Sequence, residues 1–342
     1  MVQATASLRT QREPVVQTLV GSGFVAERPL ISRSINRRNL LRGGFAAGAA
    51  LGGAALLGAT GCTKANLTGN TLQRVQDEGK IRVGFAQELP YGYIDIEGNL
   101  VGESPDVARA VLERMGIGEM EGKLTGFSGL IPALQAGYVD IVAAGMFITA
   151  DRCAAVAFSE PDYCVEQALL VPAGNPEDLA DFGTVAETGV TLGLLAGAFE
   201  LEYATQAGVE TGNILFVPDA ASGFDAVSNG SVDAFGLTSL SLRFLLQNRD
   251  EDAEEVGTGL QGSEIWVTDS FVPLFDGQPD KGCGGFAFRP ADEELRVEFD
   301  EHLIDLHESG EWLEIVEPYG FGEAEMPDDR TTADLCPDAE WL

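Results

Sequence analysis

The sequence has little positive charge. Lys and Arg together number 21 in 342 residues, against 54 Asp and Glu, and the formal net charge at neutral pH is −33. Such an excess of carboxylates repels phosphate backbones and anionic lipid surfaces. We therefore expect no nucleic-acid partner and no electrostatic attachment of the folded part to a membrane.

Several common enzyme motifs are also absent. The chain has no Gly-x-Ser-x-Gly, His-Glu-x-x-His or Gly-x-x-x-x-Gly-Lys sequence, so it lacks the signatures of a nucleophile elbow, a zinc protease and a P-loop. The two histidines, His302 and His307, are five residues apart on a predicted helix, do not share a face, and are expected to be solvated. No cysteine spacing suggests zinc. We expect no metal and no cofactor.

The first part of the chain lacks a good membrane-spanning segment, because the apolar run Gly43–Gly58 is short and rich in small residues. It follows Arg37-Arg38 and precedes Gly61-Cys62, which is the order of a secretory signal. The arginine pair resembles a twin-arginine signal, and Gly61-Cys62 resembles a lipobox with Ala59 in place of the usual Leu. Residues 1–61 are therefore predicted to be a twin-arginine-type lipoprotein signal and Cys62 a lipid anchor. The alternative for Cys62 is a free or disulfide-bonded thiol.

Cysteine is scarce in the rest of the chain, where only Cys153, Cys164, Cys283 and Cys336 remain. An even number of cysteines in an exported protein favours disulfides, and four cysteines allow three connectivities. The preferred pairing is Cys153–Cys164 with Cys283–Cys336, in which the second bridge ties down the acidic C-terminal tail.

The chain beyond residue 71 alternates short β-branched runs with helical stretches. This alternation indicates βαβ units and a mostly parallel sheet, and its repetition predicts two α/β lobes. The predicted strands are 80–85, 139–144, 190–195, 232–237 and 285–289, and the predicted helices are 104–115, 129–136, 224–229 and 293–310. The predicted divisions are a linker at 62–71, the first part of lobe 1 at 72–166, lobe 2 at 167–280, a return to lobe 1 at 281–325, and an acidic tail at 326–342.

Polar and aromatic residues follow the predicted strands of lobe 1. Glu88 and Tyr91 follow the first predicted strand, Phe147 and Arg152 follow the second, and Phe127 lies just before the predicted helix 129–136. Parallel α/β sheets bind ligands at the carboxyl ends of their strands. Aromatic faces attract cations, and Arg binds carboxylates through two hydrogen bonds. If the loops converge, this set suits a zwitterion with a delocalised cation. Taken singly, each aromatic is more often a core residue and each charged residue is more often solvated, so spacing alone does not decide.

A longer pattern supports the convergence. The segments Phe127–Ile141, Thr149–Arg152 and Phe158–Tyr163 resemble the first lobe of the polar-amino-acid family of periplasmic binding proteins. Within that family, the chain resembles the ectoine- and hydroxyectoine-binding members of ABC importers over nearly all of residues 72–325. The segments that carry this narrower likeness are Gly84–Tyr93, Ala143–Thr149, Leu194–Ala198 and Leu237–Arg243.

The resemblance implies a fold. It predicts an α/β protein with the type II, two-lobed periplasmic-binding-protein fold, in which each lobe is a mixed, mostly parallel sheet flanked by helices. A two-strand hinge would join the lobes near 164–167 and 280–284, and its motion would close the cleft over the ligand.

The resemblance also implies a ligand site. Arg152 would bind a carboxylate, Tyr91, Phe127 and Phe147 would face a cation, and Glu88 would accept a hydrogen bond from a ring N–H. Thr149 belongs to the same motif as Arg152. Backbone N–H groups of the second lobe, at Gly197 and Ala198, would add an anion-binding helix start.

Two departures from the amino-acid binders favour a cyclic amidinium carboxylate such as ectoine. Phe147 stands in place of their Ser, and Thr238 stands in place of the second-lobe Asp that pairs with an α-ammonium group. A free amino acid would then lose its countercharge. Glycine betaine has no N–H group to donate to Glu88.

These observations predict an extracytoplasmic substrate-binding protein that is not an enzyme. It would be a monomer on the outer face of the cytoplasmic membrane, held there through its lipid anchor only, and would pass a small zwitterion to ABC permease subunits. The alternatives are an amino-acid-binding protein, a dehydratase-type enzyme using Glu88 as a base, and a sensory domain on the same fold.

Overall fold

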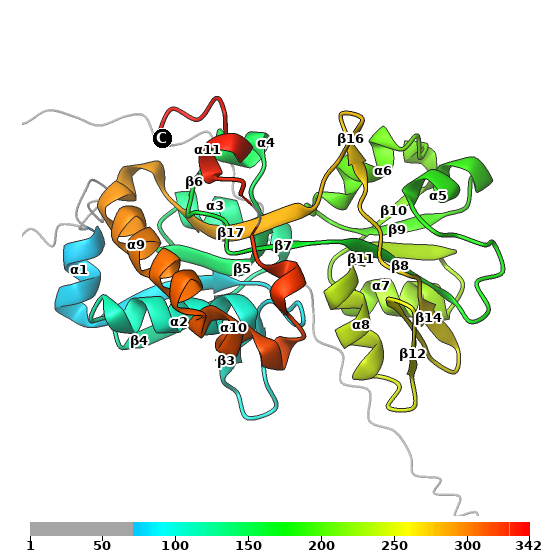
Figure 1. Ribbon diagram of the computed structural model, residues 1–342, viewed down its shortest axis with the longest axis horizontal. Coiled ribbons are helices and arrows are strands. Elements are labelled where there is room, and N and C mark those ends of the chain that lie inside the picture. Colours follow the sequence, from blue (N-terminus) through cyan, green and yellow to red (C-terminus); the bar gives the residue numbers. More distant parts are fainter. Residues whose placement is uncertain (1–70, 328) are drawn as a thin grey trace, which may run out of the picture. The chain divides into compact units, whose positions relative to one another are not determined.

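The computed structural model describes residues 71–327 and 329–342, which form two α/β lobes (Figure 1). The predicted signal, Cys62 and all but the last residue of the predicted linker 62–71 lie outside these residues. Within the described part of the chain, no helix is long and apolar enough to cross a membrane.

Lobe 1 is built on a sheet with the order β4-β1-β5-β17-β6, and β7 also pairs with β17. Strand β1 is parallel to β4 and β5, whereas β17 runs antiparallel to β5, β6 and β7. Both faces are covered by helices, so the central strands are buried along nearly their whole length. The strands are β1 (Lys80–Phe85), β4 (Glu119–Leu124), β5 (Ile141–Phe147), β6 (Ala157–Phe158), β7 (Tyr163–Val165) and β17 (Gly282–Phe288).

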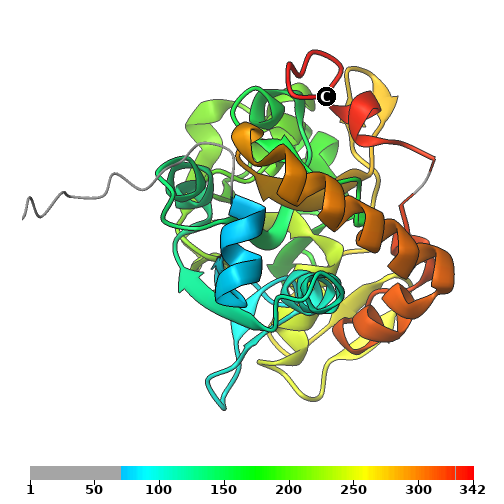
Figure 2. The same ribbon diagram turned by 90° about the vertical axis from the view of Figure 1, so that its left-hand side faces the viewer.

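The helices of lobe 1 come from both ends of the chain. In Figure 2 the blue α1 lies beside the orange α9, and these helices are in contact although more than 200 residues separate them. Helix α9 ends where Gly310 adopts the left-handed conformation, with φ of 79°, which favours glycine. The main helices are α1 (Thr71–Glu78), α2 (Glu103–Arg114), α3 (Leu130–Gln135), α9 (Glu293–Ser309) and α10 (Glu311–Val316).

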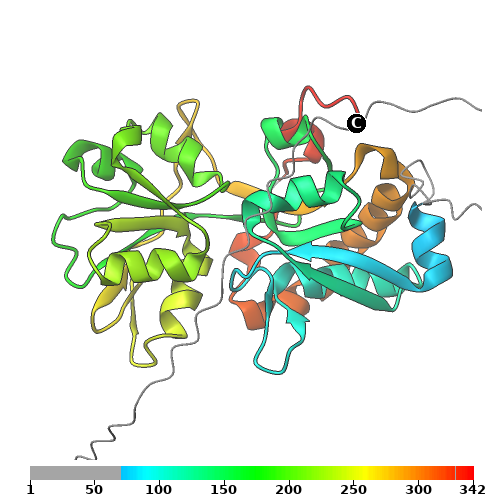
Figure 3. The same ribbon diagram turned by 180° about the vertical axis from the view of Figure 1, so that it is seen from behind.

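Lobe 2, green and yellow in Figure 3, contains a sheet with the order β10-β9-β11-β8-β14-β13-β12. Strands β9, β10 and β11 are parallel, and β8 runs antiparallel to β11. The elements used below are β8 (Gln167–Pro172), β9 (Leu192–Leu195), β10 (Ile214–Val217), β11 (Ala234–Thr238), α6 (Glu200–Gln206), α7 (Ala220–Ser228) and α8 (Ser239–Gln247). The remaining strands are β12 (Glu254–Val256), β13 (Gly259–Gln261) and β14 (Ile265–Val267).

The chain passes between the lobes twice. Strand β7 ends at Val165 in the first sheet, and β8 begins at Gln167 in the second. The return follows the hairpin of β15 (Leu274–Phe275) and β16 (Gln278–Pro279) and leads into β17. These two crossings fall in the predicted hinge segments, and the two-lobed α/β fold is confirmed.

The expected solvation of the histidines is wrong for His307. Its ring stacks on Trp312, with centroids 4.8 Å apart, and its Nε2 lies 3.4 Å from a carboxylate oxygen of Asp162. Helix α10 folds back along α9 and covers the His307 side chain, which a helix-face argument on α9 alone does not reveal. No group of three or more metal-ligand side chains occurs among the described residues.

The predicted disulfide pairing is wrong. The bridges are Cys153–Cys336 and Cys164–Cys283. Cys164 and Cys283 lie opposite each other because β7 and β17 are antiparallel neighbours in the lobe 1 sheet. This register depends on the return of the chain after lobe 2, so closeness in sequence was a poor guide.

Removing the Cys164–Cys283 bridge with paired Cys→Ser substitutions should lower the free energy of unfolding by about 2–4 kcal/mol, because the bridge restricts a long loop in the unfolded chain. Its ends are 119 residues apart. Urea unfolding of the purified domain measures this loss. Peptide mapping without reduction should recover Cys164 joined to Cys283, and recovery of a Cys153–Cys164 peptide would contradict the structure.

Candidate functional site

A small cavity lies between the two lobes. Its walls come from the segments that follow β1, β4 and β5 in lobe 1, and β9 and β11 in lobe 2, so it occupies the carboxyl ends of parallel strands. The cavity brings together seven of the nine predicted ligand-binding residues: Glu88, Tyr91, Phe127, Phe147, Arg152, Ala198 and Thr238. Thr149 and Gly197 do not line it.

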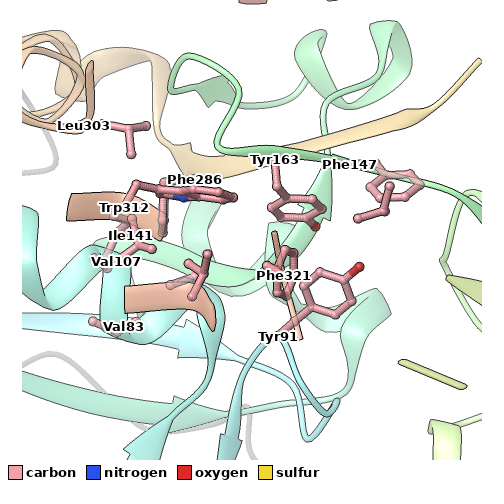
Figure 4. Close-up of a cluster of buried hydrophobic side chains, with 14 of the residues drawn as sticks. Val83, Tyr91, Val107, Ile141, Phe147, Tyr163, Phe286, Leu303, Trp312 and Phe321 are labelled. Atoms are coloured by element: carbon pink, nitrogen blue, oxygen red, sulfur yellow. The ribbon is translucent and has the colours of Figure 1, made fainter. Parts of the chain in front are cut away.

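Glycines leave the space that two of the three predicted rings occupy. A methyl group added at Gly145, whose φ is +63°, would lie 2.5 Å from the Tyr91 ring, and one added at Gly282 would lie 2.0 Å from the Phe147 ring. Larger residues at these positions would push the rings out of place. Behind the cavity, Tyr91 also packs against Tyr163 and Phe321, with centroids 5.2 and 5.6 Å away (Figure 4). The rings are therefore fixed before a ligand arrives.

Arg152 is half-buried at the lobe interface. Its guanidinium donates hydrogen bonds to the carbonyl oxygens of Phe147, at 2.8 Å, and Gly197, at 3.0 Å, and its Cζ lies 5.5 Å from the centre of the Phe127 ring. Burial lowers the pKa of Arg152 below its ordinary value. Among the described residues, no carboxylate forms an ion pair with this guanidinium. A ligand carboxylate would supply the missing partner.

The helix that carries Arg152 is anchored from two sides. Thr149 caps α4 (Ala150–Cys153), because its Oγ1 accepts a hydrogen bond from the Arg152 N–H at 3.4 Å. From the C-terminal tail, Cys336 bonds to Cys153, and Trp341 Nε1 donates to the Cys153 carbonyl oxygen at 2.8 Å. Thr149 thus acts through the position of Arg152.

Glu88 is 7% exposed and follows β1 in a tight loop, closed by two backbone hydrogen bonds with Gly92. Ser241 Oγ donates to its Oε1 at 3.0 Å. Burial raises the pKa of Glu88 to about 8, and the negative charge of Glu200 adds to the rise, while the bond from Ser241 opposes it. A cationic or N–H partner would therefore strongly stabilise the ionised form of the Glu88 carboxyl group.

The cavity contains a second carboxylate that the sequence reasoning missed. Glu200, the first residue of α6, is 3% exposed and lines the same cavity as Glu88 and Arg152. Burial raises the pKa of Glu200 to about 7. The only sequence signal was its place just after the second-lobe loop, where acidic residues are common simply because they favour helix starts. The argument that a free ammonium group would lack a countercharge did not include this acidic side chain, which lines the same cavity.

Hydrogen bonds between the lobes hold the cavity closed. The Tyr91 hydroxyl donates to Thr238 Oγ1 at 3.2 Å, Ser241 donates to Glu88, and Arg152 donates to Gly197. Each of these pairs joins side chains or backbone of opposite lobes. The structure therefore corresponds to the closed form of a two-lobed clamp.

The predicted backbone anion site is not formed in this closed cavity. The Ala198 N–H donates to the Leu195 carbonyl oxygen at 3.1 Å, and α6 begins only at Glu200. Gly197 packs against Ser128 of lobe 1, with φ of +85°, and presents its carbonyl oxygen to Arg152. The loop turns before the helix starts, so the Ala198 N–H is already occupied and the Gly197 carbonyl oxygen joins the lobes.

Raising the pH should open the ligand-free cleft. In the closed cleft the pKa of Glu88 is about 8, whereas 4.5 is the ordinary value in water. The closed form therefore keeps a proton that the open form loses, and closure weakens by up to about 1.4 kcal/mol per pH unit between these two values. Small-angle X-ray scattering should show the radius of gyration increasing from pH 5 to pH 9.

Glu88→Gln should reduce this pH-dependent expansion, because the amide cannot ionise and can still accept the bond from Ser241. Glu113→Gln is the matched control, since Glu113 is an exposed carboxylate on α2. It should behave like the wild type. The same expansion in wild type and Glu88→Gln would show that Glu88 does not control closure.

The fold and this cavity define a class, the two-lobed proteins that enclose a small charged solute between α/β lobes. Residues 81–323 match the family model for bacterial extracellular solute-binding proteins, family 3. The chain belongs to this family. Its members are extracellular solute-binding proteins, and this chain is a substrate-binding protein of an amino-acid-type ABC importer.

Individual relatives span most of the chain. It is 33% identical over 271 residues to a probable amino-acid ABC transporter periplasmic-binding protein of Sinorhizobium fredii, covering 78% of this chain and 86% of that one. The crystal structure of EhuB in complex with hydroxyectoine is 32% identical, with a TM-score of 0.68, and covers 79% and 98%. An ancestral arginine-binding protein bound to arginine is 27% identical, with a TM-score of 0.59, and covers 71% and 99%.

Proposed function

We propose that this protein captures ectoine, hydroxyectoine or a similar small zwitterion outside the cell and passes it to the permease subunits of its importer. One observation carries the proposal: Arg152 and two carboxylates share a closed, ring-lined cavity without forming ion pairs with one another. Isolated buried charges are costly. A ligand with a carboxylate at one end and a cation at the other would compensate both kinds of charge.

The rings favour a flat cation at the second pole of the ligand. Tyr91, Phe127 and Phe147 line the cavity together with a fourth ring, Phe199. Cation–π contacts contribute on the order of 2 kcal/mol when they are desolvated. A cyclic amidinium can lie against such rings and still donate an N–H hydrogen bond to Glu88. The likeness to the hydroxyectoine-binding structure supports the same ligand class.

A cationic amino acid is the second candidate. Glu200 offers a countercharge for an α-ammonium or side-chain cation, and one of the similar solved structures holds arginine. A dehydratase-type enzyme would need an acid partner for Glu88, and a sensory domain would use the same closure. Recovery of the ligand unchanged after incubation excludes turnover.

Replacing Arg152 with Ala should weaken binding of ectoine at least tenfold, because charge-assisted hydrogen bonds to a buried carboxylate are lost. Isothermal titration calorimetry with ectoine, hydroxyectoine, glycine betaine, proline and arginine measures both the ligand preference and the effect.

The matched control is Arg249→Ala, since Arg249 pairs with Asp225 on the outside of lobe 2, away from the cavity residues. Its affinities should equal those of the wild type. Tight binding of arginine and none of ectoine would overturn the ligand assignment, and unchanged affinity in Arg152→Ala would place the ligand elsewhere.

We also propose that residues 1–61 direct export by the twin-arginine route and that Cys62 carries a lipid anchor, which would be the protein's only attachment to the membrane. Both rest on the sequence alone. Cys62→Ala should move the protein from the membrane fraction to the soluble extracytoplasmic fraction, because the acylated residue is gone. Arg37→Lys with Arg38→Lys should instead keep it in the cytoplasm. Membrane association that survives Cys62→Ala would contradict the anchor.

A further inference from the structure

Glu200 differs from Glu88 in having no side-chain partner in the closed cavity. Glu88 accepts a hydrogen bond from Ser241 across the lobes. In the described part of the chain, no hydrogen bond or ion pair joins the Glu200 carboxylate to another side chain. Glu200 is only 3% exposed, and it lines the cavity. Its own backbone N–H is the one hydrogen-bond donor that lowers its pKa, and a buried carboxylate with so little compensation is costly. It points to a contact that a ligand completes.

The charges of the cavity are unequal. Glu88 and Glu200 are two acidic side chains against one guanidinium, that of Arg152. Burial raises the pKa of Glu200, and the charge of Arg152 opposes this rise although the two side chains form no ion pair. If a ligand carboxylate binds Arg152, the cationic part of the ligand faces two acceptors. One N–H group cannot serve two carboxylates on opposite lobes equally well. The site therefore calls for a cation with two or more N–H groups.

We propose that Glu200 is a second ligand-binding carboxylate, and that with Glu88 it selects cations carrying at least two N–H donors over quaternary ammonium ions. This inference rests on the proposed function for the ligand class but assigns a specificity role to a residue of lobe 2. A protonated cyclic amidinium has two ring N–H groups, one for each carboxylate. A trimethylammonium group has none, so it would leave both acceptors without a hydrogen bond.

The arrangement also explains how lobe 2 senses the ligand. Lobe 1 provides Glu88, Arg152 and three rings, so a ligand can dock there first. Glu200 stands at the start of α6 in lobe 2 and meets the ligand only when the lobes close. A second N–H bond formed on closure would stabilise the closed form, which is the differential affinity that a population shift needs.

The test is calorimetry on wild type, Glu200→Gln and Glu202→Gln with ectoine, arginine and glycine betaine. Glu202 lies on the same helix, does not line the cavity and also exerts its charge on Arg152. Glu200→Gln should weaken binding of the N–H-bearing ligand at least tenfold, and should leave the affinity for glycine betaine unchanged or higher. The ratio of the two affinities should therefore decrease. Glu202→Gln should keep the wild-type preference.

The outcomes separate this inference from the ligand assignment. If wild type binds ectoine and Glu200→Gln keeps the full preference for it, the role of Glu200 is refuted and the proposed function stands. If wild type binds only arginine and Glu200→Gln weakens that binding, the ectoine assignment fails and the role of Glu200 stands. Equal losses in Glu200→Gln and Glu202→Gln would reduce the effect to remote charge and overturn the inference. Thermal unfolding of each variant verifies that it is folded.

Discussion

The antiparallel pairing of β17 with its neighbours is the constraint on which the rest of the structure depends. Strand β17 lies inside the lobe 1 sheet, between β5 and β6, although it follows lobe 2 in the sequence. Lobe 1 is therefore incomplete until the chain has gone out and returned. This return fixes two crossings between the lobes and sets the Cys164–Cys283 bridge beside one of them.

The same strand links the fold to the site. Gly282 begins β17 and leaves room for the Phe147 ring, which ends β5 at the edge of the cavity. The C-terminal tail then returns to α4 and fixes the residue next to Arg152. The parts of lobe 1 that line the cavity are thus held by segments that follow lobe 2. A rigid first lobe and a second lobe that closes over it are what a clamp requires.

The charged side chains of the cavity do not neutralise one another. These three side chains do not pair among themselves, and Glu88 and Glu200 are buried while Arg152 is half-buried. Burial raises the pKa of both carboxyl groups and lowers the pKa of the guanidinium. The closed, ligand-free state of such a site is unfavourable, because the desolvated charges are not compensated. A ligand that carries both signs of charge removes the penalty at both ends. Closure is then coupled to the chemistry of the ligand and not merely to its size.

The sequence by itself determined the two-lobed α/β fold and most of one wall of the cavity. Periodicity located β1, β5, β9 and β11, and the position of Glu88, Tyr91 and Arg152 after strands is a local property that survives folding. The surroundings of the predicted backbone N–H groups, the disulfide partners and the place of Glu200 in the cavity were decided only by tertiary structure. Each depends on contacts between segments far apart in the chain: the register of β7 on β17, the turn before α6, and the meeting of the two lobes. Sequence spacing carries no information on such distances, whereas a buried charge without a partner becomes visible as soon as the lobes are in place.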